Sequence, residues 1–134
     1  MRRDESKTKM AKGKILVVDD DLMIRQLLSE ELTDLGYDVE TAENSGEAIY
    51  RLRRDDYDLI LLDIRLLGMS GIKLYRVMEK TPQSLADRVI FITGDVMGED
   101  THKFLSDTKC SCITKPFHMA QLTKEINHIL IQQA

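Results

Sequence analysis

The chain has 134 residues, of which 43% are hydrophobic and 31% charged, and its net charge is -4. This length suits one domain with its own buried core, and the composition is that of a globular protein in water. No apolar stretch approaches the roughly 20 residues that a membrane span needs. No hydrophobic segment follows the basic residues Arg2 and Arg3 as it would in a secretory signal, so we expect a cytoplasmic protein.

The charge is unevenly distributed along the chain. Residues 1–14 carry six Lys or Arg against two Asp or Glu, a charge of +4, so the other 120 residues carry -8. A basic start without aromatic residues is typical of a flexible tail, which we predict for residues 1–13. The acidic remainder argues against direct nucleic-acid binding through the phosphate backbone. One domain is therefore expected, over residues 14–132.

Strand and helix patterns alternate five times within this domain. The expected strands are 14–19, 37–42, 58–63, 88–93 and 110–115. Apolar residues at helical spacing predict helices over 21–35, from a cap at Asn44 or Ser45 to about 54, from about 70 to 80, over 98–107 and over 118–132. In the first helix these apolar residues are Leu22, Ile24, Leu27, Leu28, Leu32 and Leu35, and Gly36 ends the helix.

The first, third and fourth strands are nearly continuous apolar runs. Such strands are typical of a parallel sheet that helices cover on both faces. Because crossovers between parallel strands are right-handed, the pattern predicts an α/β fold with a doubly wound, five-stranded parallel sheet.

Polar residues stand where the predicted strands end. Asp19 and Asp20 close the first strand, Asp63 the third, Thr93 the fourth and Lys115 the fifth. An open parallel sheet binds its ligands outside the carboxyl ends of its strands, so we expect these five side chains to meet in one site.

The chemistry of this set favours phosphoryl transfer. Three carboxylates in one pocket repel one another, and a hard cation such as Mg2+, which prefers oxygen ligands, would offset that repulsion. A carboxylate also attacks phosphorus to give an aspartyl phosphate, which a Lys115 ammonium and a Thr93 hydroxyl would help to stabilise. The alternative, that Asp20 and Asp21 merely cap the first helix, leaves Asp63, Thr93 and Lys115 unexplained.

Four motifs follow one another along the chain: Val17-Val18-Asp19-Asp20, Asp63 with Gly68-Met69-Ser70-Gly71 beyond it, Thr93-Gly94 and Lys115-Pro116-Phe117. Together they resemble the receiver domain of two-component response regulators and are similar to those of chemotaxis-type single-domain receivers. The resemblance implies a flavodoxin-like fold with five helices and strand order 2-1-3-4-5, whose site lies between strands one and three.

The resemblance also implies a role for each site residue. Asp63 would be the phosphoacceptor, Lys115 would contact the phosphoryl group, and Thr93 would move toward it after transfer. The bond between Lys115 and Pro116 would be cis. The implied Mg2+ ligands are Asp19, Asp20, Asp63 and the backbone carbonyl of Arg65.

The chain departs from the family pattern at three places. Leu66-Leu67 replaces the usual Met-Pro, and Cys112 replaces the aromatic residue that turns inward as the threonine moves. The signal from the site to the face formed by the fourth helix, fifth strand and fifth helix would then run through Thr93. Arg65 and Asp95 flank the phosphoryl position, and we hypothesise that they pair over the pocket and tune water access, while Gly94 leaves the entrance open. The alternative is two independent, solvated side chains.

Cys110 and Cys112 lie two residues apart on a predicted strand, with both side chains on one face. We interpret them as small buried hydrophobic residues, the alternative being a redox or metal role. The three histidines, His102, His118 and His128, show no ligand spacing, and no metal is assigned to them.

The sequence thus predicts a phosphorylation-operated signalling domain, not a metabolic enzyme. A histidine kinase or phosphotransfer protein would phosphorylate Asp63, and the product would switch a surface that binds a downstream protein, as a monomer or a phosphorylation-linked dimer. One alternative is a receiver-fold binding module that works without phosphorylation, which Cys112 and Leu67 favour. Another is a Mg2+-dependent phosphatase, but Arg65 stands where such enzymes place a second Asp.

Overall fold

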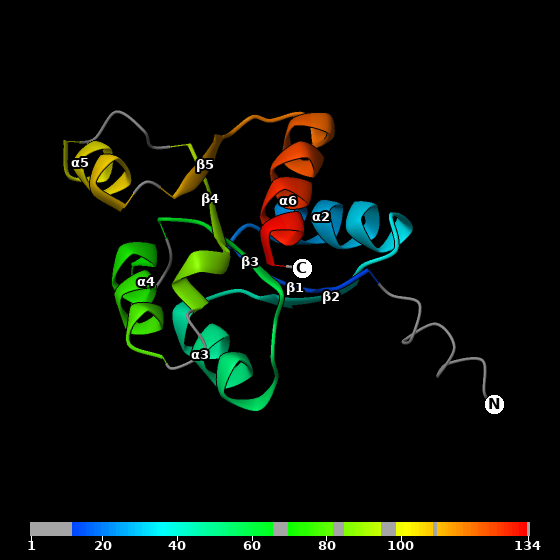
Figure 1. The fold of residues 1–134 in the computed structure, drawn as a ribbon, viewed down its shortest axis with the longest axis horizontal. Coiled ribbons are helices and arrows are strands. Elements are labelled where there is room, and N and C mark those ends of the chain that lie inside the picture. The colour runs from blue at the N-terminus through cyan, green and yellow to red at the C-terminus, as the bar shows by residue number, and fades with distance from the viewer. Residues whose placement is uncertain (1–11, 66–69, 82–84, 95–98, 109, 134) are drawn as a thin grey trace.

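The computed structural model describes residues 12–65, 70–81, 85–94, 99–108 and 110–133. Within them the elements follow in the order β1 (Lys14–Val18), α2 (Leu22–Asp34), β2 (Asp38–Ala42), α3 (Ser45–Arg54), β3 (Leu59–Leu62), α4 (Gly71–Glu79), the 3-10 helix η1 (Leu85–Arg88), β4 (Val89–Thr93), α5 (Glu99–Thr108), β5 (Ser111–Thr114) and α6 (Met119–Gln133) (Figure 1). Residues 1–11 of the predicted tail lie outside the described residues. None of the described helices is both long and apolar enough to span a bilayer.

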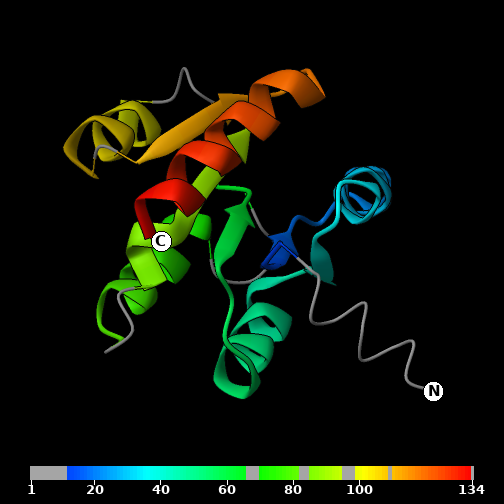
Figure 2. The same ribbon diagram turned by 45° about the vertical axis from the view of Figure 1, so that its right-hand side comes forward.

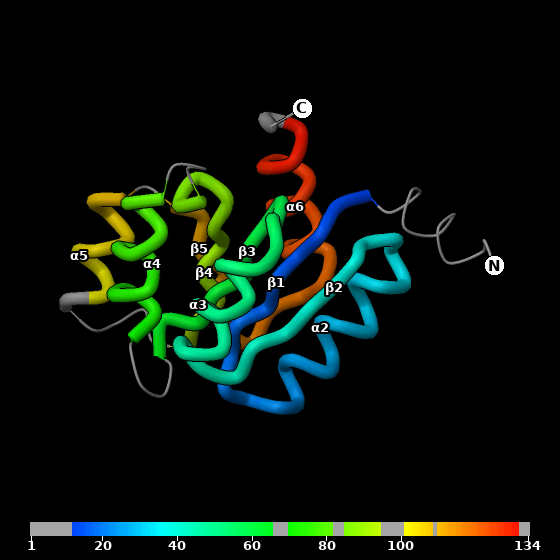
Figure 3. Tube along the Cα trace, turned by 90° about the horizontal axis from the view of Figure 1, so that it is seen from below, coloured from blue at the N-terminus to red at the C-terminus, as the bar shows by residue number. Residues whose placement is uncertain are grey.

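The five strands form one parallel sheet in the order β2-β1-β3-β4-β5, which confirms the predicted strand order. Figure 3 shows β2 at one edge, beside β1. Val18 lies opposite Leu62, and Leu62 lies opposite Phe91, so the last residues of β1 and β3 are level with each other. This register brings the residues that follow β1 and β3 to the same point of the sheet edge.

Helices cover both faces of the sheet, as the continuous apolar strands predicted (Figure 1). On one face, Ile15 and Val17 of β1 pack with residues of α2 and α6; on the other, Leu16 and Val18 pack with residues of α3, α4 and α5. In Figure 2, α2 lies over the β1–β2 side of the sheet and α6 over the β3–β5 side. Each fully buried Leu or Ile contributes roughly 1.5–3 kcal/mol to this packing.

The helix ends explain the element boundaries. Asn44, one of the two predicted caps, caps α3 by accepting a hydrogen bond from the Glu47 amide, and Asp21 caps α2 by accepting one from the Met23 amide. Gly36 follows α2 at φ +104°, a conformation that L side chains rarely adopt, which confirms the predicted stop. The 3-10 helix η1 was not predicted, because four residues are too few to show a helical period.

Candidate functional site

The site lies at the carboxyl ends of β1, β3, β4 and β5, and hydrogen bonding continues one residue past β1, β3 and β5. The Asp19 amide donates to the Ala42 carbonyl (3.1 Å), the Asp63 amide to Val18 (2.9 Å) and the Lys115 amide to Thr93 (2.9 Å). The backbone of Asp19, Asp63 and Lys115 is therefore fixed by the sheet although each residue falls outside a strand.

The three predicted carboxylates form one cluster. One carboxylate oxygen from each of Asp19, Asp20 and Asp63 lies within 4.8 Å of the others. Asp19 and Asp63 are buried, with 3% and 5% of their surface exposed, whereas Asp20 is exposed. Hard oxygen donors at this spacing, open to solvent on one side, fit a divalent cation that keeps part of its water shell. Among the described residues, this is the one acidic, His or Cys group with such spacing.

Lys115 places a positive charge between the two buried carboxylates. Its Nζ lies 2.8 Å from Asp19 Oδ2 and 3.1 Å from Asp63 Oδ2. Burial alone would lower the pKa of Lys115, but its hydrogen bonds and attraction to Asp19 and Asp63 outweigh burial and raise that pKa. The ammonium therefore stays charged. The Lys115–Pro116 peptide bond is cis, as predicted.

The surroundings of Asp63 disfavour the ionised form of its carboxyl group. Burial raises the pKa of the Asp63 carboxyl, and the nearby Asp19 charge adds to this, while the Arg65 amide hydrogen bond (3.0 Å to Oδ1) and Lys115 act in the opposite direction. The net direction is upward. A cation bound to the cluster would relieve the part that arises from charge repulsion.

A cavity of about 460 Å3 opens onto these groups. It is lined by Asp20, Asp63, Arg65, Thr93, Gly94 and Lys115, so the structure brings together the residues predicted from separate strand ends. Thr93 is fully buried at its wall. Asp95, Leu66 and Leu67 lie outside the described residues, and the predicted Arg65–Asp95 pair therefore stays a prediction.

The two cysteines are free thiols, half-buried rather than fully buried as expected, and both pack against the core. Burial raises the pKa of the Cys112 thiol. The Cys110 thiol donates a hydrogen bond to the Tyr75 hydroxyl (3.1 Å). Tyr75 also belongs to an aromatic cluster with Phe91 and Phe104, whose ring centroids are 5.3–5.5 Å apart. This cluster joins α4, β4 and α5, and no sequence pattern had indicated it.

Arg25 is a further residue at the site that the sequence analysis missed. Its Nη1 donates a hydrogen bond to the backbone carbonyl of Asp19 (2.8 Å) from the first turns of α2. The available signal was a basic residue placed six positions after Asp19, at the start of the predicted helix.

The geometry agrees with a comparison against known families. The model of the response regulator receiver domain matches residues 15–127. The chain belongs to the response regulator receiver domain family. It is therefore a receiver with an acidic pocket at Asp19, Asp20 and Asp63, a two-component phosphoacceptor and a signalling module rather than a true enzyme, as the sequence predicted.

Curated relatives of this receiver are longer proteins. It is 35% identical over 103 residues to the sensor histidine kinase RcsC of Escherichia coli, covering 76% of this chain and 10% of that protein. It is 35% identical over 124 residues to a CpxR homolog, a transcriptional regulatory protein of Haemophilus influenzae. This match covers 91% of this chain and 52% of that protein. The receiver thus spans about half the length of one relative and a tenth of the other.

Solved receivers share the fold. A CheY-like receiver domain protein from Methanospirillum hungatei superposes with a TM-score of 0.81 at 29% identity, over 90% of this chain and 94% of that one. The response regulator TrrA from Thermotoga maritima, solved in complex with Mg2+-BeF, gives a TM-score of 0.74 at 34% identity, over 87% of this chain and 98% of that one. The fold is CheY-like and flavodoxin-like, as expected.

Proposed function

We propose that Asp63 accepts a phosphoryl group from a phosphohistidine on a histidine kinase or phosphotransfer protein. The observation that carries this proposal is the position of the Asp63 carboxylate. It is buried beside two further carboxylates, hydrogen-bonded to Lys115, and lines a solvent-open cavity with Thr93. Asp19 shares the burial and the Lys115 contact, but of these two buried carboxylates Asp63 is the one that lines the cavity.

Mg2+ is the proposed cofactor, held by Asp19, Asp20, Asp63 and the backbone carbonyl of Arg65. Support comes from the oxygen cluster itself and from TrrA, a relative solved with Mg2+-BeF. When bound, the ion would neutralise charge on the carboxylates and on the incoming phosphoryl oxygens.

The residues of the chain perform the transfer by positioning and charge. An Asp63 carboxylate oxygen forms a bond to phosphorus as the phosphorus–nitrogen bond of the donor breaks, and the electron pair of that bond goes to the imidazole nitrogen. Lys115 already holds Asp63 Oδ2 and would turn one N–H to a phosphoryl oxygen. Thr93, at the cavity wall, would donate its hydroxyl to another.

The output would be a change of the surface that a downstream protein binds, within a cytoplasmic domain of residues 14–132. Thr93 is the proposed start of the signal, because Cys112 supplies a thiol where receivers usually carry an aromatic ring. Arg65, Asp95 and Gly94 remain the proposed modulators of water access. A monomer or a phosphorylation-linked dimer would fit this scheme.

The test is the intact mass of the protein after incubation with acetyl phosphate and Mg2+. We expect one phosphoryl adduct in the wild type, and none in Asp63→Asn or with a chelator. Asp56→Asn is the matched control, because the same change falls on an exposed residue before β3, and it should react like the wild type. A folded wild type that takes no adduct, from acetyl phosphate or from a phosphohistidine donor, would contradict the proposal and favour a phosphate-independent binding module.

A further inference from the structure

We propose that Arg25 is a positioning residue of the acidic site, which fixes the turn between β1 and α2 and thereby holds Asp19 and Asp20 for a divalent cation. This inference rests on the cation site of the proposed function. Arg25 does not belong to the predicted ligand set, and it acts through the backbone that carries two of the ligands.

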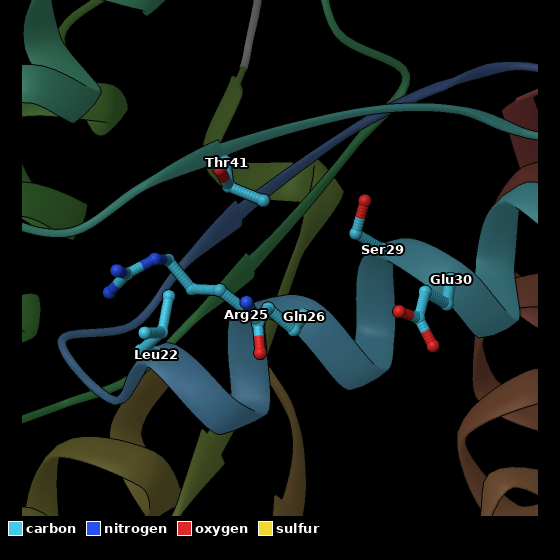
Figure 4. A pocket seen from close by; sticks show the side chains of 6 residues that line it. All are labelled: Leu22, Arg25, Gln26, Ser29, Glu30 and Thr41. Atoms are coloured by element: carbon cyan, nitrogen blue, oxygen red, sulfur yellow. The ribbon is translucent and has the colours of Figure 1, made fainter.

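Arg25 lies in α2 and contacts the turn that joins β1 to α2. The Arg25 amide donates to the Asp21 carbonyl (3.1 Å) as part of the first turn of α2. Its side chain then reaches back, and Nη1 donates to the Asp19 carbonyl at 2.8 Å. Figure 4 shows the guanidinium extending past Leu22 toward the turn that joins β1 to α2. Arg25 therefore binds both sides of Asp20.

Arg25 completes the hydrogen bonding of Asp19. The Asp19 amide donates to Ala42, its Oδ1 accepts from the Asp21 amide (2.9 Å) and its Oδ2 contacts Lys115 (2.8 Å). The carbonyl is the fourth polar atom, and Arg25 binds it. Without that bond, the peptide between Asp19 and Asp20 would lose a contact that fixes its carbonyl direction, and its rotation would move the exposed Asp20 carboxylate.

The surroundings of Arg25 allow this role to be separated from folding. The side chain lines a shallow, solvent-open groove of about 210 Å3 between α2 and β2, with Leu22, Gln26, Ser29, Glu30 and Thr41 (Figure 4). Shortening or neutralising Arg25 would therefore enlarge a groove that water fills, and would leave no void in the core. Residues that orient metal ligands typically change metal affinity by about 10-fold or more when removed.

The experiment compares Mg2+ binding of metal-free protein by calorimetry in the wild type, Arg25→Met, Arg25→Lys and Arg53→Met. Met keeps most of the apolar stem and removes the donors, and Lys restores a charged donor. Arg53→Met is the matched control, since it removes an exposed Arg from α3. We expect about 10-fold weaker binding in Arg25→Met, recovery to within about 3-fold in Arg25→Lys, and wild-type affinity in Arg53→Met.

Amide hydrogen exchange of metal-free protein gives a readout that does not depend on the cation. The amide of Asp21, which donates to Asp19 Oδ1, should exchange faster in Arg25→Met than in Arg53→Met, while core strands exchange as in the wild type. If Arg25→Met does not fold by circular dichroism, Arg25→Gln takes its place.

Equal Mg2+ affinity and equal exchange in the Arg25 and Arg53 variants would overturn the positioning role. A wild type that binds no Mg2+ would instead contradict the proposed cation site. In that case, unchanged exchange at Asp21 would contradict the positioning role as well.

Discussion

Gly71 is a position at which a single added methyl group should disturb Asp63, the proposed phosphoacceptor. It begins α4, and its amide donates to the Ile64 carbonyl (2.8 Å). A Cβ at this position would stand 2.3 Å from the carbonyl oxygen of Asp63 and 2.7 Å from the Cα of Ile64. Both are backbone atoms, which cannot turn aside as a flexible side chain would. Gly71→Ala therefore forces the start of α4 and the backbone of Asp63 apart.

The expected loss follows from these distances. Ordinary contact begins near 3.4 Å, so the backbone must move by about 1 Å, and overpacking of this kind destabilises by about 1–3 kcal/mol. The better helix propensity of Ala offsets at most about 1 kcal/mol. We therefore expect the free energy of unfolding to fall by about 2 kcal/mol. Phosphorylation by acetyl phosphate should also slow, because Asp63 itself is displaced.

Gly46 provides the matched control. It lies exposed in the first turn of α3, and a Cβ there would meet only the Asn44 Oδ1 at 3.4 Å. Gly46→Ala should leave stability unchanged or raise it by up to about 1 kcal/mol. Urea unfolding followed by circular dichroism measures both variants. A Gly71→Ala protein within about 0.5 kcal/mol of the wild type, with an unchanged phosphorylation rate, would refute this reasoning.

Three further predictions concern single groups. Asn44→Ala should lower the free energy of unfolding by about 1 kcal/mol in urea, because it removes the cap on the Glu47 amide; an unchanged midpoint would show that the cap is not needed. Because the pKa of Asp63 is raised, the folded protein keeps a proton that the unfolded chain loses above the ordinary pKa of 3.8. In the presence of a chelator, the free energy of unfolding should therefore fall as the pH rises from 3.8 to the pKa of folded Asp63. Urea unfolding across pH should show a smaller fall for Asp63→Asn, and equal slopes would contradict the burial effect. Burial raises the pKa of Cys112, so alkylation by iodoacetamide in a Cys110→Ser background should have its midpoint above pH 9.0; a midpoint at or below that value would count against it.

The fold and most of the site could be predicted from the sequence because both rest on local patterns. Continuous apolar runs marked the buried strands, and the parallel sheet rule then placed Asp19, Asp63, Thr93 and Lys115 at one edge. The strands end one residue earlier than expected at Asp19, Asp63 and Lys115, since these residues keep a ladder hydrogen bond while their side chains turn into the site.

What the sequence did not show depends on contacts between distant or unlike groups. Helical spacing grouped Leu22, Leu27 and Leu35 with the apolar face of α2, yet they are exposed, because the helix packs mainly through Leu28 and Leu32. Spacing gives the direction of a face but not how far neighbours cover it.

Two side-chain arrangements in the structure left no pattern in the sequence. The aromatic cluster of Tyr75, Phe91 and Phe104 draws one ring from each of three elements. Arg25 binds a backbone carbonyl, and a carbonyl leaves no residue-type pattern in the sequence.

The phosphorylated side chain can be identified by reducing acetyl phosphate-treated protein with borohydride and mapping its peptides. Reduction converts an aspartyl phosphate to homoserine, which marks the acceptor position. We predict homoserine at position 63, with Asp19 and Asp20 unchanged. Homoserine at position 19 or 20, or none in protein that carries the adduct, would contradict the assignment of Asp63 as the phosphoacceptor.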